Sequence, residues 1–164
     1  MANSATYILL LHLSADSTFD IGLLGECDFP GGFYAYIGAI NSQAQLVSQL
    51  KKHLQPSKSI QNDVDHIQQF MQLEEIWLSA NQMPSRTDWI DVLLDVPGSM
   101  SLIEGFGGAD VDSDWDSYLL YFDVRPMLED FAVSFRQLFP NDTVVRAFMR
   151  ADEDQPDNNQ DALT

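Results

Sequence analysis

Hydrophobic patterning over the first 40 residues predicts a meander of short strands. Residues 7–13 form an apolar run rich in branched side chains, which is typical of a buried strand, and residues 19–24 have the composition of a second one. Residues 33–37 alternate aromatic and small side chains, as a strand does. Turn-forming residues separate these runs at 14–17 and at 28–32, where Pro and Gly favour a bend.

Beyond residue 40 the apolar positions repeat with a helical period. A helix is expected over residues 42–54, with Ser42 as its N-cap and Pro56 just beyond its end. A second helix is expected over 64–71, and residues 73–78 fit either its continuation or a strand. The same patterns predict helices over 87–94 and 127–139, and strands over 118–124 and 144–149.

These elements predict one α+β domain (broadly α/β) over residues 1–150, with a small mixed or antiparallel sheet flanked by helices. A chain of 164 residues that is 45% hydrophobic is large enough to bury a core without disulfides. Residues 151–164 carry five acidic residues and no basic one, so we expect an acidic disordered tail there.

Charge restricts the partners that the protein can bind. Eight Lys and Arg residues stand against 25 Asp and Glu, which gives a formal charge of −17. Such a field disfavours nucleic acid and attracts a basic protein, although it also fits a role in solubility alone. The sequence has neither a membrane-spanning apolar run nor a secretory signal pattern, and its single cysteine, Cys27, allows no internal disulfide. We therefore expect a cytoplasmic protein.

Short motifs occur in a specific order along residues 5–122. They are Tyr7-Ile8-Leu9-Leu10, the segment 21–25, the segment 29–38 with Tyr36-Ile37-Gly38, Lys52-His53-Leu54, Asp65-His66-Ile67, the segment 105–110 and Ser117-Tyr118-Leu119. This order resembles the GIY-YIG nuclease superfamily, in particular its subgroup of small proteins known only as a domain of unknown function. The resemblance implies that two tyrosines on neighbouring strands share a site with a helical arginine and with a glutamate that holds a divalent metal. Tyr7 and Tyr36 match the two tyrosines.

The polar positions of that site are altered in this chain. Gln49 stands where the family has its arginine, and an amide supplies no charge to a phosphate. Lys52 is the cation best placed to swing toward the same side of the helix, and His53 follows it. The glutamate has no firm counterpart, although Asp88 lies in about the right helix as a candidate metal ligand. The pattern favours a catalytically degenerate domain that acts by binding and needs no cofactor.

Other interpretations remain open. A residual endonuclease would use Tyr7, Tyr36, Lys52 and an acid with Mg²⁺ or Mn²⁺. The alternating aspartates of 110–116 suggest either an acidic nucleic-acid mimic or a weak calcium site, although they fail the EF-hand pattern. His53 and His66 with a nearby acid would make a metal site. A guanidinium elsewhere, such as that of Arg86, would restore the missing charge if the fold brought it to the tyrosines.

Overall fold

The computed structural model describes residues 5–40, 48, 50–52, 63–79, 86–103, 117–140 and 144–146. Its elements, in chain order, are β1 (Ala5–Leu13), β2 (Ser17–Asp20), the short 3-10 helix η1 (Gly22–Leu24), β3 (Glu26–Phe29), β4 (Gly32–Ile40), α2 (Asp63–Gln68), β5 (Gln72–Ser79), α3 (Arg86–Leu94), β6 (Leu119–Phe122), α4 (Leu128–Leu138) and β7 (Val144–Arg146). None of these helices is both long and apolar enough to cross a bilayer.

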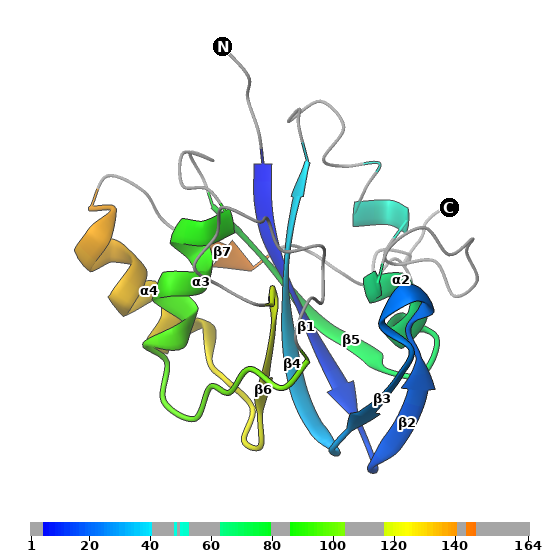
Figure 1. The fold of residues 1–164 in the computed structure, drawn as a ribbon. Coiled ribbons are helices and arrows are strands. Elements are labelled where there is room, and N and C mark those ends of the chain that lie inside the picture. The colour runs from blue at the N-terminus through cyan, green and yellow to red at the C-terminus, as the bar shows by residue number, and fades with distance from the viewer. Residues whose placement is uncertain are drawn as a thin grey trace, which may run out of the picture.

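A five-stranded sheet with the order β6-β4-β1-β5-β7 forms the centre of the described structure, and β2 pairs with β3 in a separate ribbon (Figure 1). Each pair of neighbouring strands in the described residues is antiparallel. The central strand β1 is apolar at successive positions because both of its faces are covered, and residues 8–11 have no exposed surface. An α+β fold with an antiparallel sheet, as the sequence predicts, is confirmed.

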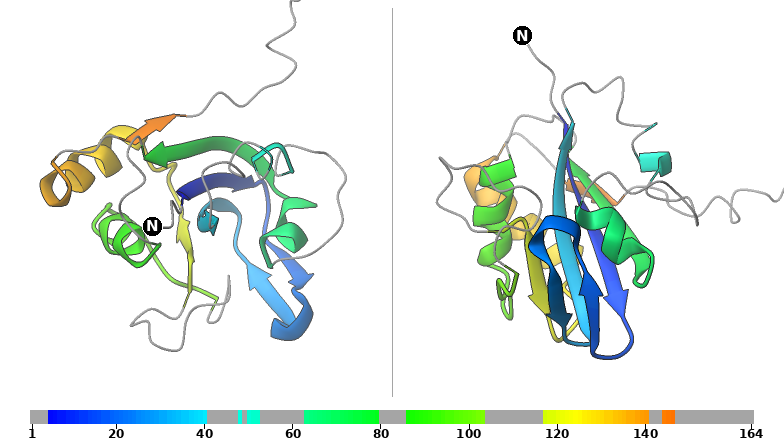
Figure 2. Two further views of the ribbon diagram at one scale, coloured as in Figure 1. Left: turned by 90° about the horizontal axis from the view of Figure 1, so that it is seen from above. Right: turned by 45° about the vertical axis from the view of Figure 1, so that its right-hand side comes forward.

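Two hydrophobic clusters cover the two faces of the sheet. The helical face packs against α3 and α4 and carries Ile8, Leu10 and Trp77. The tyrosine face packs against α2 and the β2–β3 ribbon and carries Tyr7 and Tyr36. Figure 2 shows α3 and α4 on one side of the sheet, with α2 and the ribbon on the other. Side chains alternate between the faces along each strand, so neighbouring residues in the sequence belong to different clusters.

The element predictions succeed where the period is clear and fail where glycine redirects the chain. The strand expected over 19–24 is wrong beyond Asp20, because Gly22 and Gly25 adopt φ values of 56° and 74° around a 3-10 turn. Residues 73–78 belong to strand β5 and do not continue the preceding helix.

Some predicted elements cannot be compared with the structure. Of the helix expected over 42–54, only Ser48 and residues 50–52 are described, and all are helical. The tail over 151–164 lies outside the described residues.

Candidate functional site

The two candidate tyrosines lie on neighbouring strands and on the same face of the sheet. Tyr7 of β1 is opposite Gly38 of β4, and Leu9 is opposite Tyr36. Tyr36 is therefore the diagonal neighbour of Tyr7, at a separation of roughly 7–8 Å between α-carbons in a regular sheet. The backbone register alone brings the two phenol side chains together.

Both tyrosines are buried in the hydrophobic cluster of that face. Tyr7 exposes 2% of its surface and Tyr36 exposes 7%. The ring of Tyr7 lies directly over Gly38, where an added β-carbon would overlap the Cε1, Cζ and hydroxyl oxygen of the tyrosine. Gly38 thus allows the ring to lie flat against the sheet, and the phenols belong to a packed layer.

Of the remaining predicted site residues, the structure describes Lys52 and Asp88. Lys52 is exposed, on a helical segment whose Leu50 packs against the tyrosine face. Asp88 is half-buried on α3, which packs on the helical face. Gln49 and His53 lie outside the described residues, as do the aspartates of 110–116. The structure therefore brings together the two tyrosines and separates Asp88 from them.

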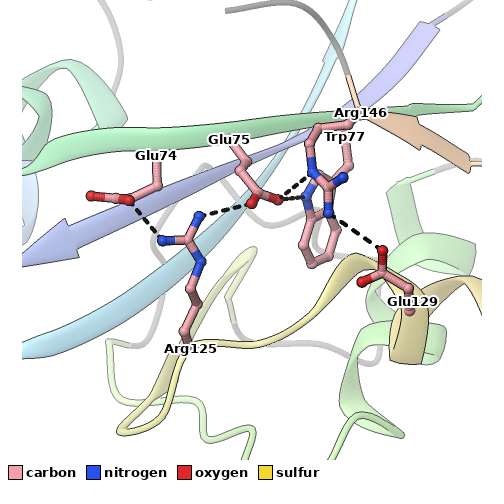
Figure 3. Close-up of polar contacts among 6 residues, drawn as sticks. All are labelled: Glu74, Glu75, Trp77, Arg125, Glu129 and Arg146. Carbon is pink, nitrogen blue, oxygen red and sulfur yellow. Dashed lines mark hydrogen bonds and ion pairs between the residues drawn. The ribbon is translucent and has the colours of Figure 1, made fainter.

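The helical face holds a network of charged side chains that sequence reasoning missed (Figure 3). Arg125 Nη1 donates to Glu74 Oε1 at 2.8 Å, and its Nη2 donates to Glu75 Oε2 at 2.7 Å. Arg146 Nε lies 3.1 Å from Glu75 Oε1, and its Nη2 lies 3.7 Å from Glu129 Oε2. The indole N–H of Trp77 donates to Glu75 Oε1 at 2.7 Å. Glu75 is the centre of this network.

A β-bulge explains how two consecutive carboxylates bind one guanidinium. Leu10 pairs with Glu75 but Leu11 pairs with Leu73, so Glu74 is an extra residue in β5. An extra residue breaks the alternation of side chains, and both carboxylates reach Arg125. Burial by itself raises the pKa of Glu75, but the hydrogen bonds from Trp77 and the two arginines outweigh it and leave the pKa below its ordinary value.

The described arginines belong to elements on the helical face. Arg125 and Arg146 are held by the Glu75 network, and Arg136 is exposed on α4. Arg86 begins α3, whose apolar side chains pack on that same face. Of the arginine side chains that the structure describes, those of Arg125, Arg136 and Arg146, none is therefore placed on the side of the sheet where Tyr7 lies.

Comparison with known proteins assigns a family. A protein-family model described as domain of unknown function DUF123 matches residues 6–139. The chain belongs to the DUF123 family. No curated protein and no solved structure matches it. The matched range covers β2 to β6 and all of β1 but Ala5, and it contains both tyrosines and Arg125.

Metal-binding groups are dispersed in the described part of this DUF123 domain. No cluster of three His, Cys, Asp or Glu side chains suited to an ion occurs there. His66 lies with its imidazole against Gly22, and His12 stacks on Phe33 with ring centroids 4.7 Å apart. The predicted site joining His53 and His66 stays a prediction, because His53 lies outside the described residues.

Proposed function

We propose that this DUF123 domain has a GIY-YIG-like scaffold without its chemistry and acts by binding a protein with a basic surface. The ordered motifs from Tyr7 to residue 119 support the scaffold, since they include both tyrosines of the resemblance. The register of β1 and β4 agrees with the expected placement of those tyrosines on neighbouring strands.

The burial of Tyr7 and Tyr36 is the observation that carries the proposal. A nucleophile must approach the reacting phosphorus to about 3–3.5 Å in line with the leaving group. Side chains that expose 2% and 7% of their surface offer no room for a phosphodiester of a polymer. The ring of Tyr7 is further fixed by its contact with Gly38, so opening the face would mean unpacking the sheet.

Charge supports the same proposal. Phosphodiester cleavage needs preorganised positive charge where the phosphate becomes more negative. Gln49 supplies none, and Arg125 and Arg146 already neutralise Glu74 and Glu75 on the opposite face. A formal charge of −17 repels a polyanion and attracts a cationic partner.

A residual metal-dependent endonuclease is the second candidate, and one observation favours it. Asp65 exposes 6% of its surface and lies on α2, which packs on the tyrosine face. A carboxylate is a ligand type that Mg²⁺ and Mn²⁺ bind, and Lys52 on a segment of the same side would supply positive charge to a phosphate. Lys52 is exposed, however, and a flexible ammonium is a poor replacement for a guanidinium fork.

Cleavage of DNA separates the two candidates. The full chain is incubated with plasmid and with single-stranded DNA in Mg²⁺ or Mn²⁺, alongside Tyr36→Phe, Asp65→Asn and Tyr121→Phe. Tyr121 is the matched control, because its hydroxyl bonds the carbonyl of Gly31. We expect no cleavage above that of buffer. Cleavage that is lost in Tyr36→Phe and Asp65→Asn but kept in Tyr121→Phe would overturn the proposal in favour of the endonuclease.

A further inference from the structure

The outer edge of β5 is only partly paired with another strand. On one side β5 pairs with β1 along residues 72–78, and on the other side it pairs with β7 through Trp77, Leu78 and Ser79. No described strand pairs with residues 72–76 on the side away from β1. A strand edge of this kind presents backbone N–H and C=O groups to which an added strand can bond.

The strand β7 is attached to this edge through few side chains. It has three residues, of which Val144 is buried in the cluster of the helical face. Val145 exposes 47% of its surface, and Arg146 is exposed as well. The DUF123 match ends at residue 139, so β7 lies beyond the matched part of the domain. Displacement of β7 would therefore expose little apolar surface.

The most specific contact of β7 is made by Arg146. It is opposite Trp77 in the register, and its Nε lies 3.1 Å from Glu75 Oε1. The same oxygen accepts from the indole N–H of Trp77 at 2.7 Å, and the Glu75 side chain is only 16% exposed. Arg146 Nη2 lies 3.7 Å from Glu129 Oε2, so the guanidinium lies between carboxylates of β5 and α4 (Figure 3). Trp77 thus positions Glu75 to receive a cation from the strand that pairs with β5.

The charges at this edge specify the cation that an added strand must bring. Glu74 and Glu75 both bind Arg125, so two carboxylates share one guanidinium if Arg146 leaves. The negative charge that remains is partly buried, and leaving it unpaired is unfavourable. Arg146 uses two different nitrogens for two carboxylates, which a guanidinium does more readily than the compact ammonium of lysine.

We propose that the outer edge of β5 is a strand-addition site, at which an extended segment of a partner protein replaces β7. The segment carries an apolar residue two positions before an arginine, as β7 does with Val144 and Arg146. Its arginine takes the place of Arg146 against Glu75. A segment longer than β7 also pairs with residues 72–76, and these additional backbone hydrogen bonds favour it over β7. The inference rests on the binding half of the proposed function and names its site.

Three peptides test this site by fluorescence anisotropy on the full chain. The first begins Val-Val-Arg and continues with alternating Thr and Gln residues to the length of β5. The second carries neutral citrulline in place of its arginine. The third is N-methylated at the backbone nitrogens that would face β5, so it keeps its charge but cannot complete the ladder. The variant R146A weakens the attachment of β7, and R136A, which removes an exposed arginine from α4, is its matched control.

We expect the arginine peptide to bind R146A about fivefold more tightly than it binds the unaltered chain, because β7 then competes less well. R136A should change the dissociation constant less than about twofold. On R146A, the citrulline and N-methylated peptides should each bind at least about fivefold more weakly than the arginine peptide. In R146A/E75Q the difference between the arginine and citrulline peptides should disappear. If that variant does not fold, the comparison of the peptides on R146A decides.

Failure of the arginine peptide to bind R146A would overturn the inference, as would equal affinity for R146A and the unaltered chain. Equal binding of the N-methylated peptide would also overturn it, since charge alone would then explain the binding. Equal binding of the citrulline peptide would remove the role of Glu75 and overturn it as well. Tyr36-dependent DNA cleavage would refute the proposed function without changing these affinities, so the two failures are distinguishable.

Discussion

The two faces of the sheet differ in how their polar groups are used. On the helical face, the Glu75 carboxylate accepts from Trp77, Arg125 and Arg146, and its charge is compensated. On the tyrosine face, two phenols are packed among apolar side chains, with Tyr7 seated on Gly38. Arg125 and Arg146 thus compensate carboxylates on one side of the sheet, while the phenols of Tyr7 and Tyr36 lie buried on the other.

The comparison of the two faces distinguishes the groups that stabilise the fold from those that a catalytic site would need. The chain itself supplies the packing partners of the core rings on both faces and the ionic partners of the charged network. Among the described residues, exposed carboxylates without an ion pair lie on the β2–β3 ribbon and also on α3 and α4; examples are Asp20, Asp91 and Asp130. The closed tyrosine face is the part of this comparison that supports our proposal of a binding domain.

Of the substitutions considered, filling the space under Tyr7 should lower the free energy of unfolding most. Gly38→Ala places a methyl group within the ring, and we expect a loss of about 3 kcal/mol in the free energy of unfolding, measured by denaturant titration. Gly98→Ala is the control: it has open space around it but a φ of 89°, so it should lose about 1–2 kcal/mol through backbone strain alone.

A double mutant isolates the ring contact. Tyr7→Ala removes the ring, so Gly38→Ala should then cost little, and the two changes should be non-additive by about 2 kcal/mol. Additive losses would mean that Tyr7 does not lie on Gly38, and the closed tyrosine face would have to be abandoned.

Breaking the charged network around Glu75 should cause the next largest loss of stability. Glu75→Gln keeps an acceptor for Trp77 but leaves Arg125 and Arg146 without that charge, and we expect a loss of about 2 kcal/mol near neutral pH. Glu129→Gln is the matched control, because Glu129 is 68% exposed and 3.7 Å from its partner; it should change stability by less than about 0.5 kcal/mol.

The pH dependence of unfolding gives an independent measure of the same network. Because folding lowers the pKa of Glu75, its contribution is fully present above the unfolded-state pKa and is lost as the pH falls through the folded-state pKa. Stability of the unaltered chain should therefore decline below about pH 4.5 more steeply than that of Glu75→Gln. Parallel curves would show that Glu75 is not held by the two arginines.

The smallest expected effect comes from the second buried tryptophan. Trp77 and Trp89 both lack exposed surface, but within the described part of the chain the indole N–H of Trp89 has no hydrogen-bond partner. Trp89→Phe removes this unsatisfied donor, so its loss of packing is offset and stability should change by less than about 1 kcal/mol. Trp77→Phe, which removes the hydrogen bond to Glu75, should lower stability clearly more. Thermal unfolding of both variants measures the difference.

Local patterns predict most of the elements because the faces that an element buries set the period of its apolar residues. The apolar run of β1 and the helical period of α4 are of this kind. The effect of a glycine is harder to predict from the sequence. The composition of residues 19–24 predicts a strand through Gly22, but the left-handed φ of Gly22 does not continue a strand. The strand order of the sheet depends on pairings between distant segments, which no local pattern specifies.

The candidate site, too, is predicted only in part by the sequence. The resemblance places Tyr7 and Tyr36 on neighbouring strands, which agrees with the register, but it does not predict their burial. Two consecutive acids in an otherwise apolar strand, Glu74 and Glu75, were the available signal for the bulge. Their partner Arg125 is 50 residues from Glu75, so only the tertiary structure could identify it.

Chemical nitration of the folded protein tests the closed tyrosine face most directly. Tetranitromethane modifies accessible phenols, and mass spectrometry of the digested protein locates each modified tyrosine. We predict that half-buried Tyr121 reacts first and that Tyr7 and Tyr36 stay unmodified until denaturant unfolds the sheet. Nitration of Tyr7 or Tyr36 in the folded protein at the rate of Tyr121 would show that these phenols can be reached from solvent, and would contradict the account.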